Sequence, residues 1–249
     1  MIDFVPADWS APPRVKALAS TRRGGFSRAP FDSLNLGSHV GDDPHAVMRN
    51  RERLVADLAL PGMPAWLEQV HGRDVVDAAS PAGCRADAVY SDRPGVVCAV
   101  LTADCLPLLI CSRRGDEVCA VHAGWRGLYG GVVQAAVRRF RCPPDELRVW
   151  LGPAIGPECF EVGADVRDLA ARVDARLVSA FRPMHAKTGY WLLDIYESAR
   201  ILLACLGVNF VSGGDCCTVS APDRFYSYRR DGRTGRMASL IWIDERRTE

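Results

Sequence analysis

Two histidines and one cysteine in the first half of the chain are the side chains best suited to chemistry. His71 ends Gln-Val-His, Cys105 ends Thr-Ala-Asp-Cys, and His122 precedes Ala-Gly-Trp-Arg-Gly. Two imidazoles and one thiolate suit Zn²⁺, and three protein ligands with one open position are typical of a catalytic zinc site. Such an ion activates a bound water or polarises a leaving group. These three residues are therefore predicted to form a metal site.

The same residues allow two other interpretations. Cys105 could be a nucleophile that His122 activates, with Asp104 or another polar group orienting the base. Cys105, His122 and Asp104 are accordingly predicted as catalytic residues. A set of two histidines and one cysteine also suits blue copper, which normally adds an axial methionine, but no methionine lies near these positions in the sequence. Five histidines are too few for a multicopper oxidase. Zn²⁺ is therefore predicted over copper, and the thiol nucleophile stays open.

Apolar runs surround two of these residues and predict the elements that position them. Residues 96–101, 106–111 and 118–121 are rich in β-branched residues and are predicted to be buried strands. Cys105 and His122 then lie where strands meet loops, a common location for functional sites. A short strand over 65–70 is predicted to deliver His71. A helix over 130–140 begins close behind His122, where its N-terminus would favour an anion.

The rest of the pattern predicts further helices and one long loop. Asp43-Pro44 indicates the start of a helix that continues to about residue 60. Helical stretches are also predicted at 163–180 and 190–206. The segment 21–44 is rich in Gly, Ser, Asn, Asp and Pro, and irregular segments of this length are often binding loops. The chain is therefore predicted to be an α+β protein with a mixed β core flanked by helices, in a single domain over residues 1–249.

Composition excludes several classes of partner. The chain has 249 residues, with 48% hydrophobic and 24% charged, as in ordinary soluble proteins. A formal net charge of +1 gives no electrostatic reason to expect nucleic acid or a membrane surface as partner. No signal peptide or membrane-length apolar run is visible. The ten cysteines are scattered without a CxxC pair, which fits a reducing compartment. A cytoplasmic location is expected.

Long motifs connect the sequence to a known family. They are SLNLGSHVGDDP (33–44) followed by Asn50-Arg51, WLEQVHG (66–72), ADAVYSDRPGVVCAVLTADCLPLL (86–109), AVHAGWRGLYGG (120–131), LGPAIGPECFEVG (151–163), GGDCCT (213–218) and FYSYRRDGRTGRMASLIW (225–242). The sequence resembles the laccase-domain family of YfiH-like and YlmD-like proteins, once labelled multicopper polyphenol oxidases. The resemblance covers nearly the whole chain.

The resemblance implies both a site and an activity. It implies a zinc site made of His71, Cys105 and His122. It also implies phosphorolysis of adenosine, inosine, guanosine or methylthioadenosine to base and ribose 1-phosphate, with adenosine deamination as a side activity. The implied fold is a single multilayer α+β domain with buried mixed β-sheets, similar to bacterial toxins that act as cysteine hydrolases. A cysteine hydrolase or amidase that edits a peptidoglycan precursor is therefore the alternative. A copper polyphenol oxidase and a non-enzymatic metal-holding module are weaker ones.

Substrate contacts are predicted from residue chemistry within these motifs. The partners are expected to be a purine nucleoside and phosphate, bound by a monomer or small homo-oligomer. Arginine suits bidentate binding of phosphate. An aromatic ring at Trp125, Phe225 or Tyr228 would stack on the base. The residues predicted to bind nucleoside or phosphate are Asn35, Arg51, Arg126 and Arg230.

Overall fold

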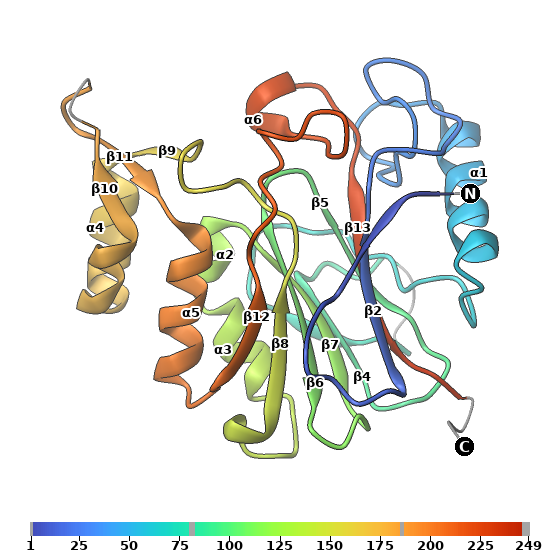
Figure 1. Cartoon of the computed structure of the whole chain (residues 1–249), viewed down its shortest axis with the longest axis horizontal. Coiled ribbons are helices and arrows are strands. Elements are labelled where there is room, and N and C mark those ends of the chain that lie inside the picture. The colour runs from blue at the N-terminus through green and yellow to red at the C-terminus, as the bar shows by residue number, and fades with distance from the viewer. Residues whose placement is uncertain (1, 80–82, 185–186, 246–249) are drawn as a thin grey trace.

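The computed structural model describes residues 2–79, 83–184 and 187–245, and it stacks their elements in four layers. Two β-sheets pack face to face in the middle of the molecule (Figure 1). Helices α2 (Trp125–Gly130), α3 (Val132–Val137) and α5 (Ile195–Cys205) cover the outer face of the larger sheet, and α1 (Pro44–Asp57) covers the outer face of the smaller one. This arrangement confirms the predicted α+β architecture of buried mixed sheets flanked by helices.

The larger sheet has six strands in the order β12-β8-β6-β7-β4-β3 and carries the core of the fold. β6 pairs antiparallel with both β7 and β8, whereas β12 and β3 join parallel to their neighbours. Every residue of β4, β6 and β7 is buried, as their apolar runs predict. The strands are β3 (Val75–Asp77), β4 (Ala88–Ser91), β6 (Leu106–Ser112), β7 (Val118–Ala123), β8 (Leu147–Leu151) and β12 (Phe210–Gly213).

The smaller sheet has four antiparallel strands in the order β1-β2-β13-β5. Its inner face buries Val100 and Ile241 against Leu109 of the larger sheet. β5 ends at Thr102 and β6 begins at Leu106, so the short connection that contains Cys105 passes from one sheet to the other. The strands are β1 (Phe4–Pro6), β2 (Val15–Ser20), β5 (Cys98–Thr102) and β13 (Met237–Ile243).

The helices and the small outer sheet complete the described chain. Asp43 caps the first helix by accepting a hydrogen bond from the backbone N–H of His45, as Asp43-Pro44 predicts. Among the described residues, none of the helices has both the length and the apolar character needed to cross a bilayer. The helices are α1 (Pro44–Asp57), α2 (Trp125–Gly130), α3 (Val132–Val137), α4 (Ala164–Val173), α5 (Ile195–Cys205) and α6 (Tyr228–Asp231), with 3₁₀ turns at Pro144–Glu146 and Ala175–Ala180. The outer sheet contains β9 (Glu161–Gly163), β10 (Phe181–Pro183) and β11 (Tyr190–Leu193).

Three predicted elements differ in the structure. The segment 65–70 makes only isolated bridges, Ala65 to Cys98 and Glu68 to Arg85, in place of a strand. The predicted helix 130–140 is two short helices, because Gly131 adopts a left-handed conformation with φ 96° and interrupts the helix. The first of them begins at 125, nearer to His122 than predicted. Residues 190–193 form β11, so the last long helix begins only at 195.

Candidate metal centre and active site

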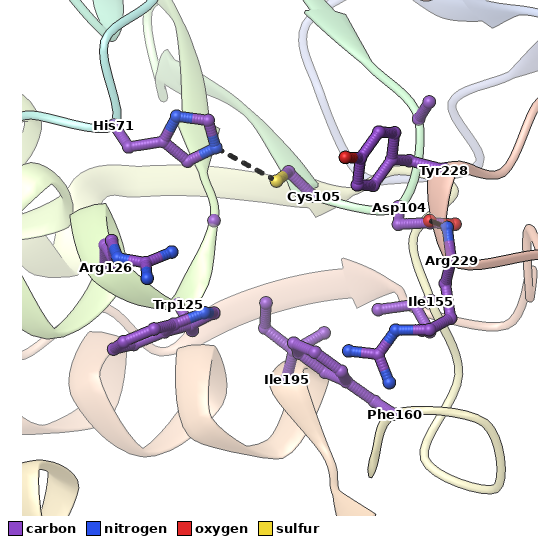
Figure 2. Close-up of a pocket in the computed structure, with 12 residues that line it drawn as sticks. His71, Asp104, Cys105, Trp125, Arg126, Ile155, Phe160, Ile195, Tyr228 and Arg229 are labelled. Atoms are coloured by element: carbon purple, nitrogen blue, oxygen red, sulfur yellow. Dashed lines mark hydrogen bonds between the residues drawn. The ribbon is translucent and has the colours of Figure 1, made fainter. Parts of the chain in front are cut away.

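His71, Cys105 and His122 converge in the structure although they lie far apart in the sequence. One donor atom from each lies within 4.8 Å of the others, and the group could hold a metal ion. Nε2 of His71 lies 3.7 Å from Sγ of Cys105 (Figure 2). The two imidazole rings meet edge to face, with ring centroids 4.8 Å apart. The convergence of the three predicted ligands is therefore present in the fold.

Asp87, at the entrance to β4, holds both histidines in place. Its fully buried carboxylate accepts a hydrogen bond from Nδ1 of His122 at 2.8 Å, which leaves Nε2 of that ring as the donor to a metal. The same carboxylate accepts the backbone N–H groups of Val70, His71 and Gly72 at 3.2, 2.9 and 2.6 Å. These bonds hold His71 in a left-handed conformation with φ 59°, which is uncommon for a residue other than glycine. Second-sphere carboxylates orient metal-binding histidines in this way.

The charges at the centre favour an ionised thiol. Burial raises the pKa of Cys105, but the neighbouring imidazoles, His122 above all, outweigh burial and bring it to about 6. Burial lowers the pKa of His122, and the nearby Cys105 and Asp87 outweigh burial and bring it to about 9. Without a metal the pair is therefore a thiolate and an imidazolium. A cation bound among the donors would replace the imidazolium proton, so the donor set fits a metal such as zinc.

Gly124 is required because the centre is tightly closed. A Cβ atom at this position would lie 2.9 Å from Sγ of Cys105 and 2.9 Å from Cδ2 of His71. The backbone of Gly124 has φ −64°, which any residue can adopt, so its role is to leave space rather than to permit an unusual turn. The Ala-Gly step after His122 thus lets α2 begin directly beside two of the ligands.

Asp104, next to Cys105 in the chain, connects three segments through hydrogen bonds. Its carboxylate accepts a hydrogen bond from Oγ1 of Thr218 at 2.6 Å and from the backbone N–H of Arg229 at 2.6 Å. Its backbone carbonyl accepts the N–H of Ile155 at 2.9 Å. Asp104 is nearly buried and has φ 96°. The carboxylate bonded to His122 is that of Asp87, so the bonds of Asp104 indicate that it positions the loops around Cys105.

Two cavities adjoin the His71, Cys105 and His122 group and share part of their lining. One, of about 270 Å³, has largely apolar and aromatic walls, and the other, of about 350 Å³, is more polar. Both are lined by His71, Ala103, Cys105 and Tyr228. The aromatic cavity adds Asp104, Gly124, Trp125, Arg126, Ile155, Phe160, Ile195 and Arg229 (Figure 2). The polar cavity adds His39, Gln69, Leu101, Thr102, His122 and Arg236.

Of the four residues predicted to bind substrate, Arg126 lines one of these cavities. Its guanidinium lies 4.2 Å from the ring centroid of Trp125. Arg51 is not among the residues that line either cavity, and its Nε and Nη2 donate to the carbonyl of Leu36 at 3.0 and 2.8 Å. Asn35 is fully buried, and its Oδ1 accepts the backbone N–H of Arg236 at 2.9 Å. Asn35 therefore holds the backbone of Arg236, which lines the polar cavity, and Arg51 holds the backbone at Leu36.

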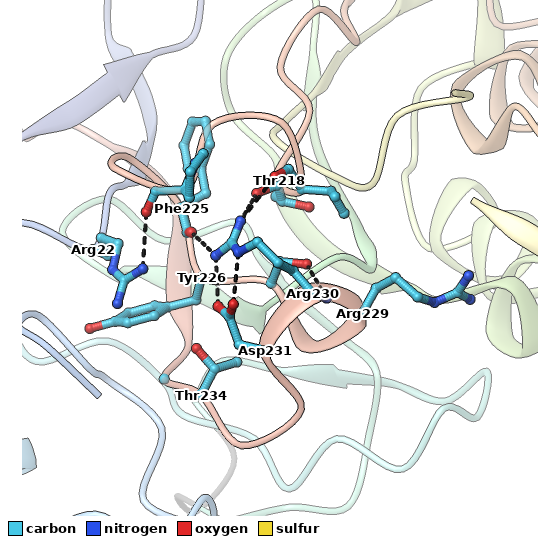
Figure 3. A network of polar contacts seen from close by, with 12 residues as sticks. Arg22, Thr218, Phe225, Tyr226, Arg229, Arg230, Asp231 and Thr234 are labelled. Carbon is cyan, nitrogen blue, oxygen red and sulfur yellow. Dashed lines mark hydrogen bonds and ion pairs between the residues drawn. The ribbon is translucent and has the colours of Figure 1, made fainter. Parts of the chain in front are cut away.

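Arg230 is fully engaged in holding its own segment together. Its Nη1 donates to the carbonyls of Thr218 and Val219 at 2.8 and 3.1 Å, and Nη2 donates to the carbonyl of Phe225 at 3.0 Å (Figure 3). Nε and Nη2 also bond the carboxylate of Asp231. These bonds fasten α6 to the loop before it. Phe225 is buried, whereas Trp125 and Tyr228 line the aromatic cavity.

Several residues around the centre were not predicted. Asp87 could have been identified from the sequence, since an acidic residue inside a buried apolar run needs hydrogen-bond donors. Arg229 and Arg236 lie close to Arg230 in the sequence, but their individual positions depend on tertiary contacts. Nη1 of Arg236 donates to the carbonyls of Thr234 and Gly235 at 3.0 and 2.9 Å, while its side chain lines the polar cavity. His39, on the long loop 21–44, lines the same cavity.

Comparison with known proteins places the chain in a family. The family model described as multi-copper polyphenol oxidoreductase laccase matches residues 16–244, and the chain belongs to this family. It is 56% identical to the purine nucleoside phosphorylase of Pseudomonas aeruginosa, over 97% of this chain and 99% of that one. It is 52% identical to the purine nucleoside phosphorylase YfiH of Escherichia coli, over 98% and 100% of the two chains.

Solved structures show the same fold. A Neisseria meningitidis protein of the DUF152 family superposes with a TM-score of 0.93 at 50% identity, over 97% of this chain and 99% of that one. YlmD from Geobacillus stearothermophilus superposes with a TM-score of 0.82 at 34% identity, over 95% and 96% of the two chains. The predicted resemblance to YfiH-like and YlmD-like proteins is confirmed.

Proposed function

We propose that the chain is a zinc-dependent purine nucleoside phosphorylase. It would convert adenosine, inosine, guanosine or methylthioadenosine and phosphate to the free base and ribose 1-phosphate, with adenosine deamination as a side activity. The observation that carries the proposal is the His71–Cys105–His122 group, of which His71 and Cys105 line both cavities and His122 lines the polar one. The relatives named as purine nucleoside phosphorylases support the same reaction class.

In this proposal, the aromatic cavity binds the purine. Trp125, Phe160 and Tyr228 offer ring faces on which a flat base can stack, and Arg126 and Arg229 lie at its polar side. The apolar walls exclude water from the base, which strengthens every hydrogen bond made to it. The ribose then lies at the common wall, where His71 and Cys105 separate the two cavities.

The polar cavity would bind phosphate. The Arg236 guanidinium lines it together with the imidazole of His39. Burial, followed by the charges of Arg236 and Arg51, lowers the pKa of His39. A neutral His39 can accept a hydrogen bond from a phosphate hydroxyl while Arg236 offsets the anion's charge. In this proposal phosphate reaches C1′ from the polar cavity while the base occupies the aromatic cavity.

His71, Cys105 and His122 would hold the zinc ion. When bound, zinc would supply a Lewis acid beside the glycosidic bond. Asp87 keeps Nδ1 of His122 protonated and so directs the other ring nitrogen toward the centre. The same geometry also supports a second candidate function, that of a thiol hydrolase. Cys105, His122 and Asp87 are arranged in the order of nucleophile, base and orienting acid that such hydrolases use. An amidase acting through Cys105 is that candidate.

Product analysis separates the two functions. Inosine and adenosine are incubated with wild-type protein and with Cys105→Ala, with and without phosphate, and the products are resolved. We expect wild-type protein to release hypoxanthine and adenine only with phosphate, to form inosine slowly from adenosine, and Cys105→Ala to do neither. Absence of nucleoside turnover by zinc-loaded protein would contradict the proposal. Rapid alkylation of Cys105 in that protein would instead favour the amidase.

Two arginine substitutions test the division between the cavities. In Arg236→Ala we expect the KM for phosphate to rise by about tenfold or more, because a charge-assisted hydrogen bond contributes about 1.5–3 kcal/mol. In Arg126→Ala we expect the KM for inosine to rise while the KM for phosphate stays within about twofold. The two variants are each other's control. If each variant raised the KM for phosphate and the KM for inosine equally, the assignment of phosphate to the polar cavity and of the nucleoside to the aromatic cavity would be contradicted.

A further inference from the structure

Two cysteines outside the metal centre form a second group of reactive side chains. Oγ of Ser220 lies 3.3 Å from Sγ of Cys217 and 3.6 Å from Sγ of Cys159, so one hydroxyl contacts both sulfurs. The two thiols also interact with each other. Both cysteines are partly exposed and unpaired. Within the described chain the group of potential metal ligands is His71, Cys105 and His122, so these two cysteines belong to no such group.

The surroundings of Cys217 favour its thiolate. The backbone N–H of Gly156 points at its sulfur at 3.2 Å. Burial raises the pKa of Cys217, but hydrogen bonds from the Ser220 hydroxyl and from the backbone N–H groups of Ser220, Gly156 and Val219 outweigh burial and lower it. Burial raises the pKa of Cys159. The pair therefore combines one thiol whose ionisation is favoured by hydrogen bonds with one whose ionisation is disfavoured by burial, the arrangement found in reactive cysteine pairs.

Both cysteines adjoin the aromatic cavity. Cys159 precedes Phe160, which lines that cavity, and Cys217 precedes Thr218, which bonds Asp104 at 2.6 Å. Gly156 makes the close approach possible, because a Cβ atom there would lie 3.0 Å from both Cβ and Sγ of Cys217. A covalent change at the pair would thus act on two segments that shape the cavity.

We propose that Cys217 and Cys159 form a hydroperoxide-reactive pair that closes to a reversible disulfide beside the aromatic cavity. The Cys217 thiolate attacks the peroxide O–O bond, and it becomes a sulfenic acid while the peroxide leaves as an alcohol or water after taking up a proton. The Cys159 thiol then attacks the sulfenic sulfur, forming the S–S bond and expelling water. Two thiols thereby lose two electrons to one peroxide, and a dithiol reductant restores them.

Peptide mapping of the whole, metal-loaded protein tests the pair without an activity assay. Protein is treated with hydrogen peroxide, alkylated, digested without reductant and analysed by mass spectrometry. We expect a peptide containing Cys159 to be linked to one containing Cys217, at a mass lower by two hydrogens, and to separate after dithiothreitol. The link should be lost in both Cys159→Ser and Cys217→Ser. Circular dichroism verifies that the variants are folded.

Cys216→Ser is the matched control, because Cys216 is the adjacent residue in the chain and burial raises its pKa. We expect this variant to form the 159–217 link as wild-type protein does. A link that moves to Cys216, or peroxide treatment that yields only sulfinic acid at Cys217 or no modification of either cysteine, would overturn the proposal. Because the readout is a peptide mass, its failure is distinguishable from a failure of the proposed nucleoside chemistry.

Discussion

Replacement of Asp87 by alanine is expected to abolish metal retention and activity together. The carboxylate is fully buried, and four donors depend on it, from the His122 ring and from the backbone at Val70, His71 and Gly72. Removing a second-sphere partner of one metal-binding histidine costs about 10–100-fold in metal affinity. Because Asp87 orients two ligands, we expect at least this loss. Removing one member of a buried pair also lowers the free energy of unfolding by about 3–5 kcal/mol.

Asp87→Asn is the control for this prediction. It preserves the size of the side chain and can still accept two of the four hydrogen bonds, so its metal affinity should lie between those of wild-type protein and Asp87→Ala. Metal titration and chemical denaturation of both variants measure the two effects. Metal affinity within about twofold of wild type in Asp87→Ala would contradict the role given to this residue.

The ionisation of Asp87 is also expected to make the free energy of unfolding depend on pH. Burial raises its pKa, but hydrogen bonds from His122 and Gly72 outweigh burial, so the pKa in the folded protein is below its ordinary value. Its contribution to the free energy of unfolding is therefore fully present above the ordinary Asp pKa of about 3.9 and is lost as the pH falls through the lower folded-state value.

Replacement of Asp104 by alanine is expected to weaken nucleoside binding more than metal binding. The carboxylate connects the loop of Cys105 to Thr218 and to the start of α6 through two bonds of 2.6 Å. Without it, Tyr228 and Arg229 lose the contact that holds them at the aromatic cavity. We expect the KM for inosine to rise by about tenfold or more, while zinc content stays near that of wild-type protein.

Asp104→Asn is the matched variant, because asparagine tolerates the positive φ of this position and retains one acceptor. It should recover most of the binding lost in Asp104→Ala. A catalytic carboxylate would behave differently, since the amide would then lower kcat as much as alanine does with KM unchanged. Steady-state kinetics of the two variants distinguish the positioning role from the catalytic one.

The parts of the fold that were predictable depend on local pattern. The runs around Cys105 and His122 are buried on both faces, so their apolar character alone indicates strands. The segment that delivers His71 was wrongly predicted as a strand, since its conformation comes from long-range bonds to Asp87 rather than from pairing. The helix after His122 was misplaced because Gly131 divides it.

In the site too, some residues could be identified from the sequence, whereas others depend on tertiary contacts. Ligand chemistry identified the three metal-binding candidates, and the fold brings them together. The arginines that line the cavities could not be identified in this way, because residue type does not determine whether a guanidinium faces a cavity. Arg230 binds backbone carbonyls beside α6, whereas the nearby Arg236 lines the polar cavity. Only tertiary contacts distinguish the two.

The most direct test of the central claim joins metal content to phosphorolysis in one preparation. Zinc per chain and phosphate-dependent hypoxanthine release from inosine are measured before chelation, after dialysis against a chelator, and after zinc is restored. We predict close to one zinc per chain, loss of activity with the metal, recovery with zinc, and no recovery in Cys105→Ala. Undiminished phosphorolysis by the zinc-free protein would contradict the assignment of His71, Cys105 and His122 as the metal centre of the reaction.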